Sequence, residues 1–159
     1  MSARGYFGVG IGGSKSEVNV GTLWRSASAL GAAFVFTAGR RYPRQASDTA
    51  ETWRHVPYLE FPSAEALFDA MPRGCVPVAV EIDERAVTLP GFRHPERACY
   101  ILGAEDNGLP RRVLDRVPSV VSIPSNVCLN VAVAGSIVMY DRATKAPRGA
   151  SADVVRYGP

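Results

Sequence analysis

The sequence contains few of the residues that bind metals or form disulfide networks. Its 159 residues include three cysteines, widely spaced and without a C-x-x-C pair, and two histidines. A structural zinc site needs four such ligands at short spacings, and a disulfide framework needs an even number of cysteines. We therefore expect neither a metal site nor a disulfide scaffold.

Long apolar runs and a strong charge of one sign are also missing. The N-terminal residues MSARGYFGV lack the apolar core of a secretory signal, and no later run is long enough to span a membrane. The formal net charge of +3 permits an anionic partner but does not require one. These absences favour a cytoplasmic protein that makes no membrane contact.

The composition that is present is typical of one globular domain. Apolar residues make up 47% of the chain and charged residues 21%, and a chain of this length fits a single core. We therefore treat residues 1–159 as one domain, in which about residues 146–159 form a tail.

Short apolar segments alternate with segments of helical periodicity. We expect strands at residues 6–11, 32–37, 77–82, 99–104 and 119–123, and helices at 19–30, 63–71, just after Pro110 and at 130–143. This alternation predicts an α/β fold, a mostly parallel sheet with helices on both faces. Asn19 and Ser63 are the expected N-caps of the first two helices, and Gly31 is the expected stop of the first.

The stretch GVGIGG at residues 8–13 has the bare G-x-G-x-x-G spacing of a dinucleotide-binding turn. In that turn the helix begins inside the motif, and an acidic residue follows about twenty positions later. Here Gly8 and Gly10 fall within an expected strand, and arginines follow the next strand. We expect these glycines to shape a strand end and a flexible turn. A nicotinamide-dependent oxidoreductase stays an alternative, because an arginine suits a phosphorylated cofactor.

The segment 38–55 has no clear periodicity and is rich in arginine. Arg40, Arg41 and Arg44 lie close together in it. Because guanidinium groups pair well with phosphates, this segment is either a solvated surface loop or an arm that contacts phosphates.

Three further segments resemble motifs of the SpoU/TrmH branch of the SPOUT RNA methyltransferases. They are NVGTLWRSASALG at residues 19–31, ILGAEDNGLP at 101–110 and IPSNVCLNVAVAGSIVMYD at 123–141. They occur in the family's order and cover nearly the whole chain. The resemblance implies a parallel sheet with a C-terminal trefoil knot, S-adenosylmethionine as methyl donor, and a homodimer that methylates a ribose 2′-hydroxyl in RNA.

The resemblance also implies roles for individual residues. Arg25 would grip the phosphate beside the reacting ribose and stabilise the developing alkoxide, because a guanidinium stays protonated and is a poor base. Asn19, Glu105 and Asn130 would build and orient the catalytic site. Backbone or apolar groups of five residues would line the donor pocket: Val80, Gly103, Ile123, Cys128 and Leu129. Arg40, Arg41 and Arg44 would contact RNA.

Each of these residues also has an ordinary structural interpretation. Arg25 could be an exposed arginine paired with Glu17 or Asp48, and Asn19 and Asn130 could simply cap helices. The pocket residues could be plain core.

Cys128 departs from the family pattern, because many relatives have serine at this position and a thiol is a weaker hydrogen-bond partner than a hydroxyl. The departure leaves open a homologue that binds RNA without methylating it. The favoured function is an S-adenosylmethionine-dependent RNA 2′-O-methyltransferase that acts on tRNA, with a wobble-position ribose as first candidate. Ribosomal RNA is the alternative substrate.

Overall fold

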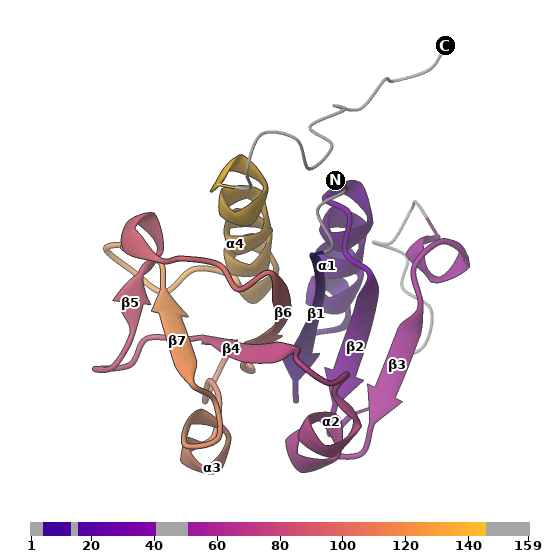
Figure 1. The fold of residues 1–159 in the computed structure, drawn as a ribbon, viewed down its shortest axis with the longest axis horizontal. Coiled ribbons are helices and arrows are strands. Elements are labelled where there is room, and N and C mark those ends of the chain that lie inside the picture. The colour runs from indigo at the N-terminus through magenta and orange to yellow at the C-terminus, as the bar shows by residue number, and fades with distance from the viewer. Residues whose placement is uncertain (1–4, 14–15, 41–50, 146–159) are drawn as a thin grey trace.

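A computed structural model describes residues 5–13, 16–40 and 51–145 of the chain. Within these residues the strands form one seven-stranded sheet in the order β3-β2-β1-β6-β4-β7-β5, and each neighbouring pair is parallel (Figure 1). The strands are β1 (Tyr6–Gly12), β2 (Phe34–Ala38), β3 (Tyr58–Phe61), β4 (Val76–Val80), β5 (Val87–Thr88), β6 (Arg97–Leu102) and β7 (Ser119–Ser122). The helices are α1 (Glu17–Ala29), α2 (Ala64–Ala70), α3 (Arg111–Leu114) and α4 (Val131–Lys145), with 3₁₀ turns at Thr52–Arg54 and Leu89–Gly91.

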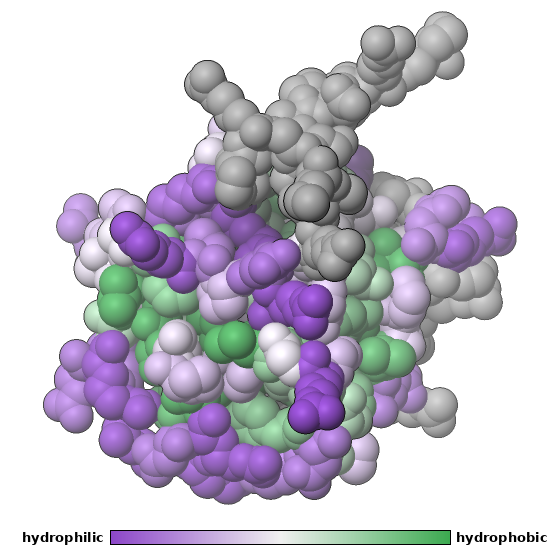
Figure 2. All heavy atoms as spheres, in the orientation of Figure 1, coloured by the Kyte–Doolittle hydropathy of each residue, from purple (hydrophilic) through white to green (hydrophobic). Residues whose placement is uncertain are grey.

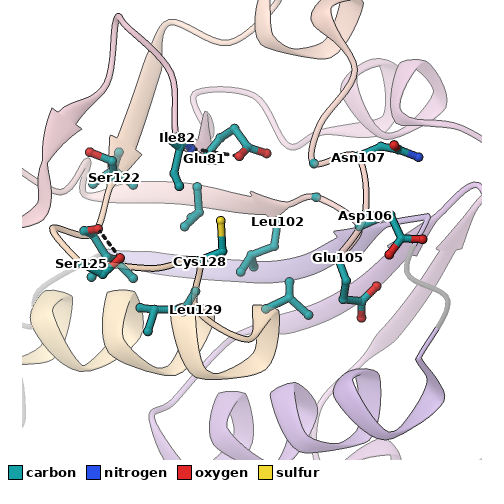
Figure 3. Close-up of a pocket in the computed structure, with 18 residues that line it drawn as sticks. Glu81, Ile82, Leu102, Glu105, Asp106, Asn107, Ser122, Ser125, Cys128 and Leu129 are labelled. Atoms are coloured by element: carbon teal, nitrogen blue, oxygen red, sulfur yellow. Dashed lines mark hydrogen bonds between the residues drawn. The ribbon is translucent and has the colours of Figure 1, made fainter.

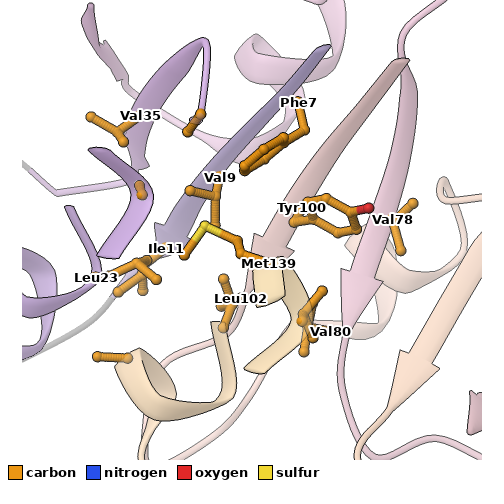
Figure 4. Close-up of a cluster of buried hydrophobic side chains, with 14 of the residues drawn as sticks. Phe7, Val9, Ile11, Leu23, Val35, Val78, Val80, Tyr100, Leu102 and Met139 are labelled. Atoms are coloured by element: carbon orange, nitrogen blue, oxygen red, sulfur yellow. The ribbon is translucent and has the colours of Figure 1, made fainter. Parts of the chain in front are cut away.

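Helices cover both faces of this sheet, which confirms the predicted α/β class. α1 and α4 pack on one face, and α2 and α3 pack on the other (Figure 1). In the central strand β6, Tyr100 and Leu102 face α1 and α4, whereas Cys99 and Ile101 face α2 and α3. Figure 4 shows the first of these two clusters, where Met139 of α4 meets side chains from the strands. No helix in the described residues is long and apolar enough to cross a membrane.

The glycines of β1 make room for aromatic side chains of the neighbouring strand. Gly8 pairs with Phe34 and Gly10 pairs with Phe36 in the parallel register of β1 and β2. A Cβ added at Gly8 would lie 2.1 Å from the ring of Phe34, and one at Gly10 would lie 2.5 Å from the ring of Phe36. β1 ends at Gly12, and Gly13 follows with a φ of 70°. Packing and a strand end therefore account for the glycine-rich stretch without a nucleotide.

The first helix begins earlier than the sequence analysis predicted. Ser16 is its N-cap, because the Ser16 Oγ accepts a hydrogen bond from the backbone N–H of Asn19 at 3.3 Å. The prediction that Asn19 is the N-cap is wrong, since Ser16 already supplies the side-chain acceptor that the first turn needs. The end of the helix is as predicted: Leu30 is the C-cap, and Gly31 follows with a φ of 80°.

The second predicted cap is confirmed, and two strands were not predicted. Ser63 caps α2 by accepting a hydrogen bond from the backbone N–H of Ala66 at 3.1 Å. The edge strands β3 and β5 have four and two residues, and two residues of β3 and both residues of β5 are exposed. Short, exposed strands carry little apolar periodicity, so the sequence gives no signal for them.

α1 and α4 lie against each other on their face of the sheet. A Cβ at Gly135 of α4 would lie 2.4 Å from a methyl group of Leu23 in α1, and Ser136 donates a hydrogen bond to the Oγ of Ser26 at 2.8 Å. Each helix follows a strand of the parallel sheet, so both helices begin at the carboxyl edge of the sheet. Ligand sites of open α/β sheets form at this edge.

Candidate functional site

Three of the predicted catalytic residues form a chain of hydrogen bonds at the carboxyl edge of the sheet. The Asn19 Nδ2 donates to the Glu105 Oε1 at 2.6 Å, and the Asn130 Nδ2 donates to the Asn19 Oδ1 at 2.8 Å. Asn19 lies in the first turn of α1, Glu105 in the loop after β6, and Asn130 just before α4. The fold therefore brings together residues that are up to 111 positions apart.

Asn130 also caps α4, as its ordinary structural interpretation predicts. Its Oδ1 accepts hydrogen bonds from the backbone N–H groups of Ala132 at 2.9 Å and Val133 at 3.2 Å. This is the geometry of a side-chain N-cap. With its oxygen bound to the helix, the amide nitrogen is directed to Asn19. Capping thus fixes the orientation that the contact with Asn19 requires.

Beside this chain lies a cavity of about 370 Å³. The segments that follow β4, β6 and β7 form its walls, together with the first residues of α4. All five residues predicted to bind a donor line it: Val80, Gly103, Ile123, Cys128 and Leu129. Figure 3 shows Cys128 and Leu102 at the cavity, between Ser125 on one side and Asp106 on the other.

The wall of the cavity that follows β6 is a tight turn of the backbone. The loop 103–109 folds back on itself, with the Gly108 N–H donating to the Ala104 carbonyl at 2.9 Å. A Cβ at Gly103 would lie 2.3 Å from the carbonyl carbon of Gly108. Gly108 itself has a φ of 59°, which favours glycine. The two glycines therefore allow a close backbone turn at the cavity.

The side chains around the cavity suit a ligand that is partly apolar and positively charged. Apolar side chains come from every wall, and carboxylates come from three residues: Glu81, Glu105 and Asp106. Among the described residues that line the cavity, none is an arginine, lysine or histidine. Such a cavity favours a cation over an anion, which argues against a nucleotide phosphate at this place.

Comparison with known protein families identifies the family of this chain. The model of the SpoU rRNA Methylase family matches residues 9–140. The chain belongs to the SpoU rRNA methylase family. No curated protein sequence matches the chain.

Solved structures are consistent with this SpoU family membership. The SpoU methyltransferase AviRb from Streptomyces viridochromogenes is 25% identical with a TM-score of 0.76, and the match covers 87% of this chain and 59% of AviRb. A structure described as giving insights into the 2-OH methylation of C/U34 on tRNA is 26% identical with a TM-score of 0.73, and the match covers 87% of this chain and 94% of that one. The TrmH/SpoU tRNA modifying enzyme of A. aeolicus is 19% identical with a TM-score of 0.78, with 89% of this chain and 75% of that enzyme covered, and shows the fold alone.

S-adenosylmethionine is the cofactor of this family, as the sequence analysis predicted. AviRb has been solved in complex with AdoMet, and that structure is 25% identical to this SpoU chain with a TM-score of 0.76. The match covers 87% of this chain and 57% of that protein.

Arg25 lies apart from the other predicted catalytic residues of this SpoU protein. It comes six residues after Asn19, which is about 240° around an ideal helix, and its side chain is exposed. Within the described residues it forms no ion pair, with Glu17 or any other carboxylate; Asp48 lies outside them. Within one protomer, Arg25 therefore lies outside the set of hydrogen bonds that joins Asn19 to Glu105 and Asn130.

The arginines of α3 differ from Arg25, because carboxylates neutralise them. Figure 2 shows hydrophilic side chains gathered over the edge of the molecule where α3 lies. Arg111 pairs with Asp115 at 2.9 Å, and Arg112 pairs with Glu65 at 3.0 Å. Of the three arginines predicted to contact RNA, Arg40 is exposed at the end of the described segment after β2, and Arg41 and Arg44 lie outside the described residues.

Glu81 lines the cavity from the end of β4 but was not among the predicted site residues. The same is true of Ile82, Ser122 and Val131. A signal for Glu81 was present, since a carboxylate directly follows a buried parallel strand at the edge where ligands bind. Nothing in the sequence indicated which backbone groups this carboxylate contacts.

Proposed function

We propose that this chain is an S-adenosylmethionine-dependent RNA 2′-O-methyltransferase with tRNA as its substrate. One observation carries the proposal: the segments after β4, β6 and β7 converge on a cavity of about 370 Å³, and the Glu105–Asn19–Asn130 chain of hydrogen bonds lies beside it. The donor pocket and the residues expected to act on the acceptor are thus adjacent.

The chemistry of S-adenosylmethionine fits the residues around this cavity. Its purine suits the apolar side chains, and its sulfonium and ammonium groups suit the carboxylates of Glu105 and Asp106. The volume is within the usual range for small-molecule sites. Bound there, the molecule would supply an electrophilic methyl group, and the chain would have to align a ribose hydroxyl with it.

Asn19, Glu105 and Asn130 orient that site in the proposed mechanism. The amide of Asn19 is held from both sides, by Glu105 and by Asn130, so its position is fixed by two other segments. Arg25 binds the phosphate beside the reacting ribose and stabilises the alkoxide that forms when the ribose hydroxyl loses its proton. Because Arg25 is exposed and distant from Asn19 on α1, we assign it to the cavity of a second subunit.

A homodimer would bring Arg25 to that position. Val133, Ile137 and Tyr140 form one stripe of α4, and 37–63% of their side chains is exposed. Val18 is 65% exposed on the same face of the adjacent α1 as Arg25, since the two are seven residues apart. An apolar surface of this kind on two packed helices is typical of a subunit interface. Sedimentation equilibrium tests the dimer, with Ile137→Glu expected to yield monomers.

The proposed knot is supported by strand order. β6 lies between β1 and β4, and β4 lies between β6 and β7, so the chain returns twice to the middle of the sheet. The loops that follow these strands form the cavity walls. We propose that the C-terminal part is threaded into a trefoil knot, which an experimental crystal structure would test.

Methylation of purified RNA tests the proposed activity. The protein is incubated with methyl-labelled donor and either tRNA or ribosomal RNA, and 2′-O-methylnucleosides are identified by mass spectrometry after digestion. We expect label in tRNA at the wobble position. We propose that position because the structure described as giving insights into the 2-OH methylation of C/U34 on tRNA is matched over 94% of its own chain. Label in ribosomal RNA alone would show that ribosomal RNA, and not tRNA, is the substrate. Methylation of a base would overturn the 2′-O proposal.

Cys128 favours a second candidate, a homologue that binds RNA without methylating it. This thiol lines the cavity where many relatives have a serine hydroxyl. Calorimetric titration with S-adenosylmethionine distinguishes the two candidates. Absence of binding at millimolar donor would support the second candidate, and Cys128→Ser would then be expected to restore binding.

The basic segment after β2 is proposed to bind RNA. Alanine at Arg40, Arg41 and Arg44 removes three positive charges, so RNA affinity should fall and its dependence on salt should flatten. Filter binding at several salt concentrations measures both quantities. Unchanged affinity and slope would assign this segment to ordinary surface.

A further inference from the structure

Glu81 connects two walls of the cavity through both oxygens of its carboxylate. Its Oε1 accepts a hydrogen bond from the backbone N–H of Ile82 at 2.9 Å, and its Oε2 accepts one from the backbone N–H of Leu109 at 2.9 Å (Figure 3 shows the first). The Glu81 backbone N–H donates to the Val121 carbonyl at 3.0 Å. One residue thus links the ends of β4 and β7 with the loop after β6.

The loop after β6 is shaped to receive this carboxylate. A Cβ at Gly108 would lie 2.4 Å from the Glu81 Oε2, so a larger residue at position 108 would displace the side chain. Leu109 is buried, and without Glu81 its N–H would lose the acceptor seen here. A buried donor without a partner is costly, so the loop and the carboxylate depend on each other.

We infer that Glu81 is a positioning residue for the donor cavity, fixing the loop 103–109 relative to residues 80–82. Both hydrogen-bond partners of the Glu81 side chain are N–H donors. A carboxylate has two acceptor oxygens for them, whereas an amide side chain has only one. Glutamine has one oxygen and one NH₂, so it would direct a donor at one of the two N–H groups. This inference rests on the proposed function, because it takes the cavity to be the donor site.

Glu81→Gln tests the inference, with Glu84→Gln as the matched control. Glu84 lies three residues further on, is exposed and has no hydrogen-bond partner among the described residues, so the control makes the same charge change without touching the cavity. Loss of one backbone hydrogen bond should raise the Kd for S-adenosylmethionine by about 10-fold to 100-fold. The control should bind like the wild type.

Three further measurements separate positioning from a general loss of structure and from direct charge attraction. kcat at saturating donor should stay within about 3-fold of wild type while KM for the donor rises, since a displaced wall mainly weakens donor binding. The product S-adenosylhomocysteine, which keeps the ammonium and carboxylate groups but lacks the sulfonium charge, should lose affinity by the same factor as the donor. Thermal unfolding followed by circular dichroism confirms that the variant remains folded.

The binding experiments distinguish a failure of this inference from a failure of the proposed function. If the wild type binds the donor and Glu81→Gln binds it equally well, the positioning role is overturned and the proposed function stands. A loss of affinity confined to S-adenosylmethionine overturns positioning in favour of attraction between Glu81 and the sulfonium. If the wild type binds no donor, both the proposed function and the inference are overturned.

Discussion

Replacing Gly103 by alanine tests whether the loop after β6 shapes the cavity that we propose as the donor site. A Cβ at this position would lie 2.3 Å from the carbonyl carbon of Gly108 and 2.5 Å from the backbone nitrogen of Leu109. Carbon atoms in contact are normally at least about 3.5 Å apart, so the loop has to move by roughly 1.2 Å. The obstructing atoms are backbone, which cannot rotate aside as a side chain does.

The expected cost follows from this overlap. Overpacking costs about 1–3 kcal/mol, and we expect about 2–3 kcal/mol here because backbone must shift. For a chain of this size that loss lowers Tm by roughly 4–12 °C. A displacement of about 1 Å at a site costs up to roughly 100-fold in activity, and we expect the Kd for S-adenosylmethionine to rise at least about tenfold.

Calorimetry and thermal unfolding measure both effects, with Gly12→Ala as the control. Gly12 ends β1 at the same edge of the sheet, and a Cβ there would meet no atom closer than 3.7 Å. The control should keep the wild-type Tm and donor affinity. The reasoning is refuted if Gly103→Ala binds the donor as tightly as wild type and its Tm falls by no more than about 1 °C.

Three other changes probe the site and the fold. Asn19→Ala removes the hydrogen bonds at 2.6 and 2.8 Å to Glu105 and Asn130, so we expect roughly 100-fold slower methyl transfer and about 1–2 kcal/mol lower stability by urea unfolding. Arg25→Ala should abolish methyl transfer while the donor Kd changes by no more than about 3-fold, since Arg25 is proposed to act on the acceptor. Burial lowers the pKa of His94. As the pH falls, His94 therefore takes up a proton in the unfolded chain before it does so in the folded chain. The free energy of unfolding should be highest above about pH 6.5 and fall as the pH drops from there toward the folded pKa.

Each of these predictions has a result that contradicts it. Wild-type turnover in Asn19→Ala or Arg25→Ala would remove that residue from the mechanism. For His94, whose side chain is 5% exposed and bonded to Asp141 at 2.9 Å, urea unfolding at pH 7.5 and pH 5.5 compares the wild type with His94→Gln. Equal pH dependence in the two proteins would show that His94 is not the group responsible.

The elements that the sequence predicted are those with strong local signals. The central strands are buried on both faces, so they appear as short apolar runs, and Ser63 and Gly31 act on backbone groups within a few residues of themselves. Asn19 shows the limit of such reasoning. Ser16 and Asn19 are both good caps, and the sequence did not show which of them meets the first turn.

The family motifs predicted several residues that the structure brings together at the cavity, although not how they contact one another. Asn19 and Glu105 are 86 positions apart and Asn130 is 111 positions from Asn19, so their hydrogen bonds depend on where parallel strands place the ends of three segments. Glu81 depends on tertiary structure even more strongly. Its partner Leu109 is 28 positions away, in a loop whose turn is set by backbone contacts between glycines.

The sequence by itself determined the α/β class and most strands and helices, and its resemblance to the family indicated part of the cavity lining. Only the tertiary structure decided that Ser16 caps α1, that Asn19 joins Glu105 to Asn130, and that Glu81 ties the loop after β6 to the end of β4. The physical reason is range. Apolar periodicity and helix capping act between neighbours in the chain, whereas hydrogen bonds between loops exist only after the sheet has set the positions of their ends.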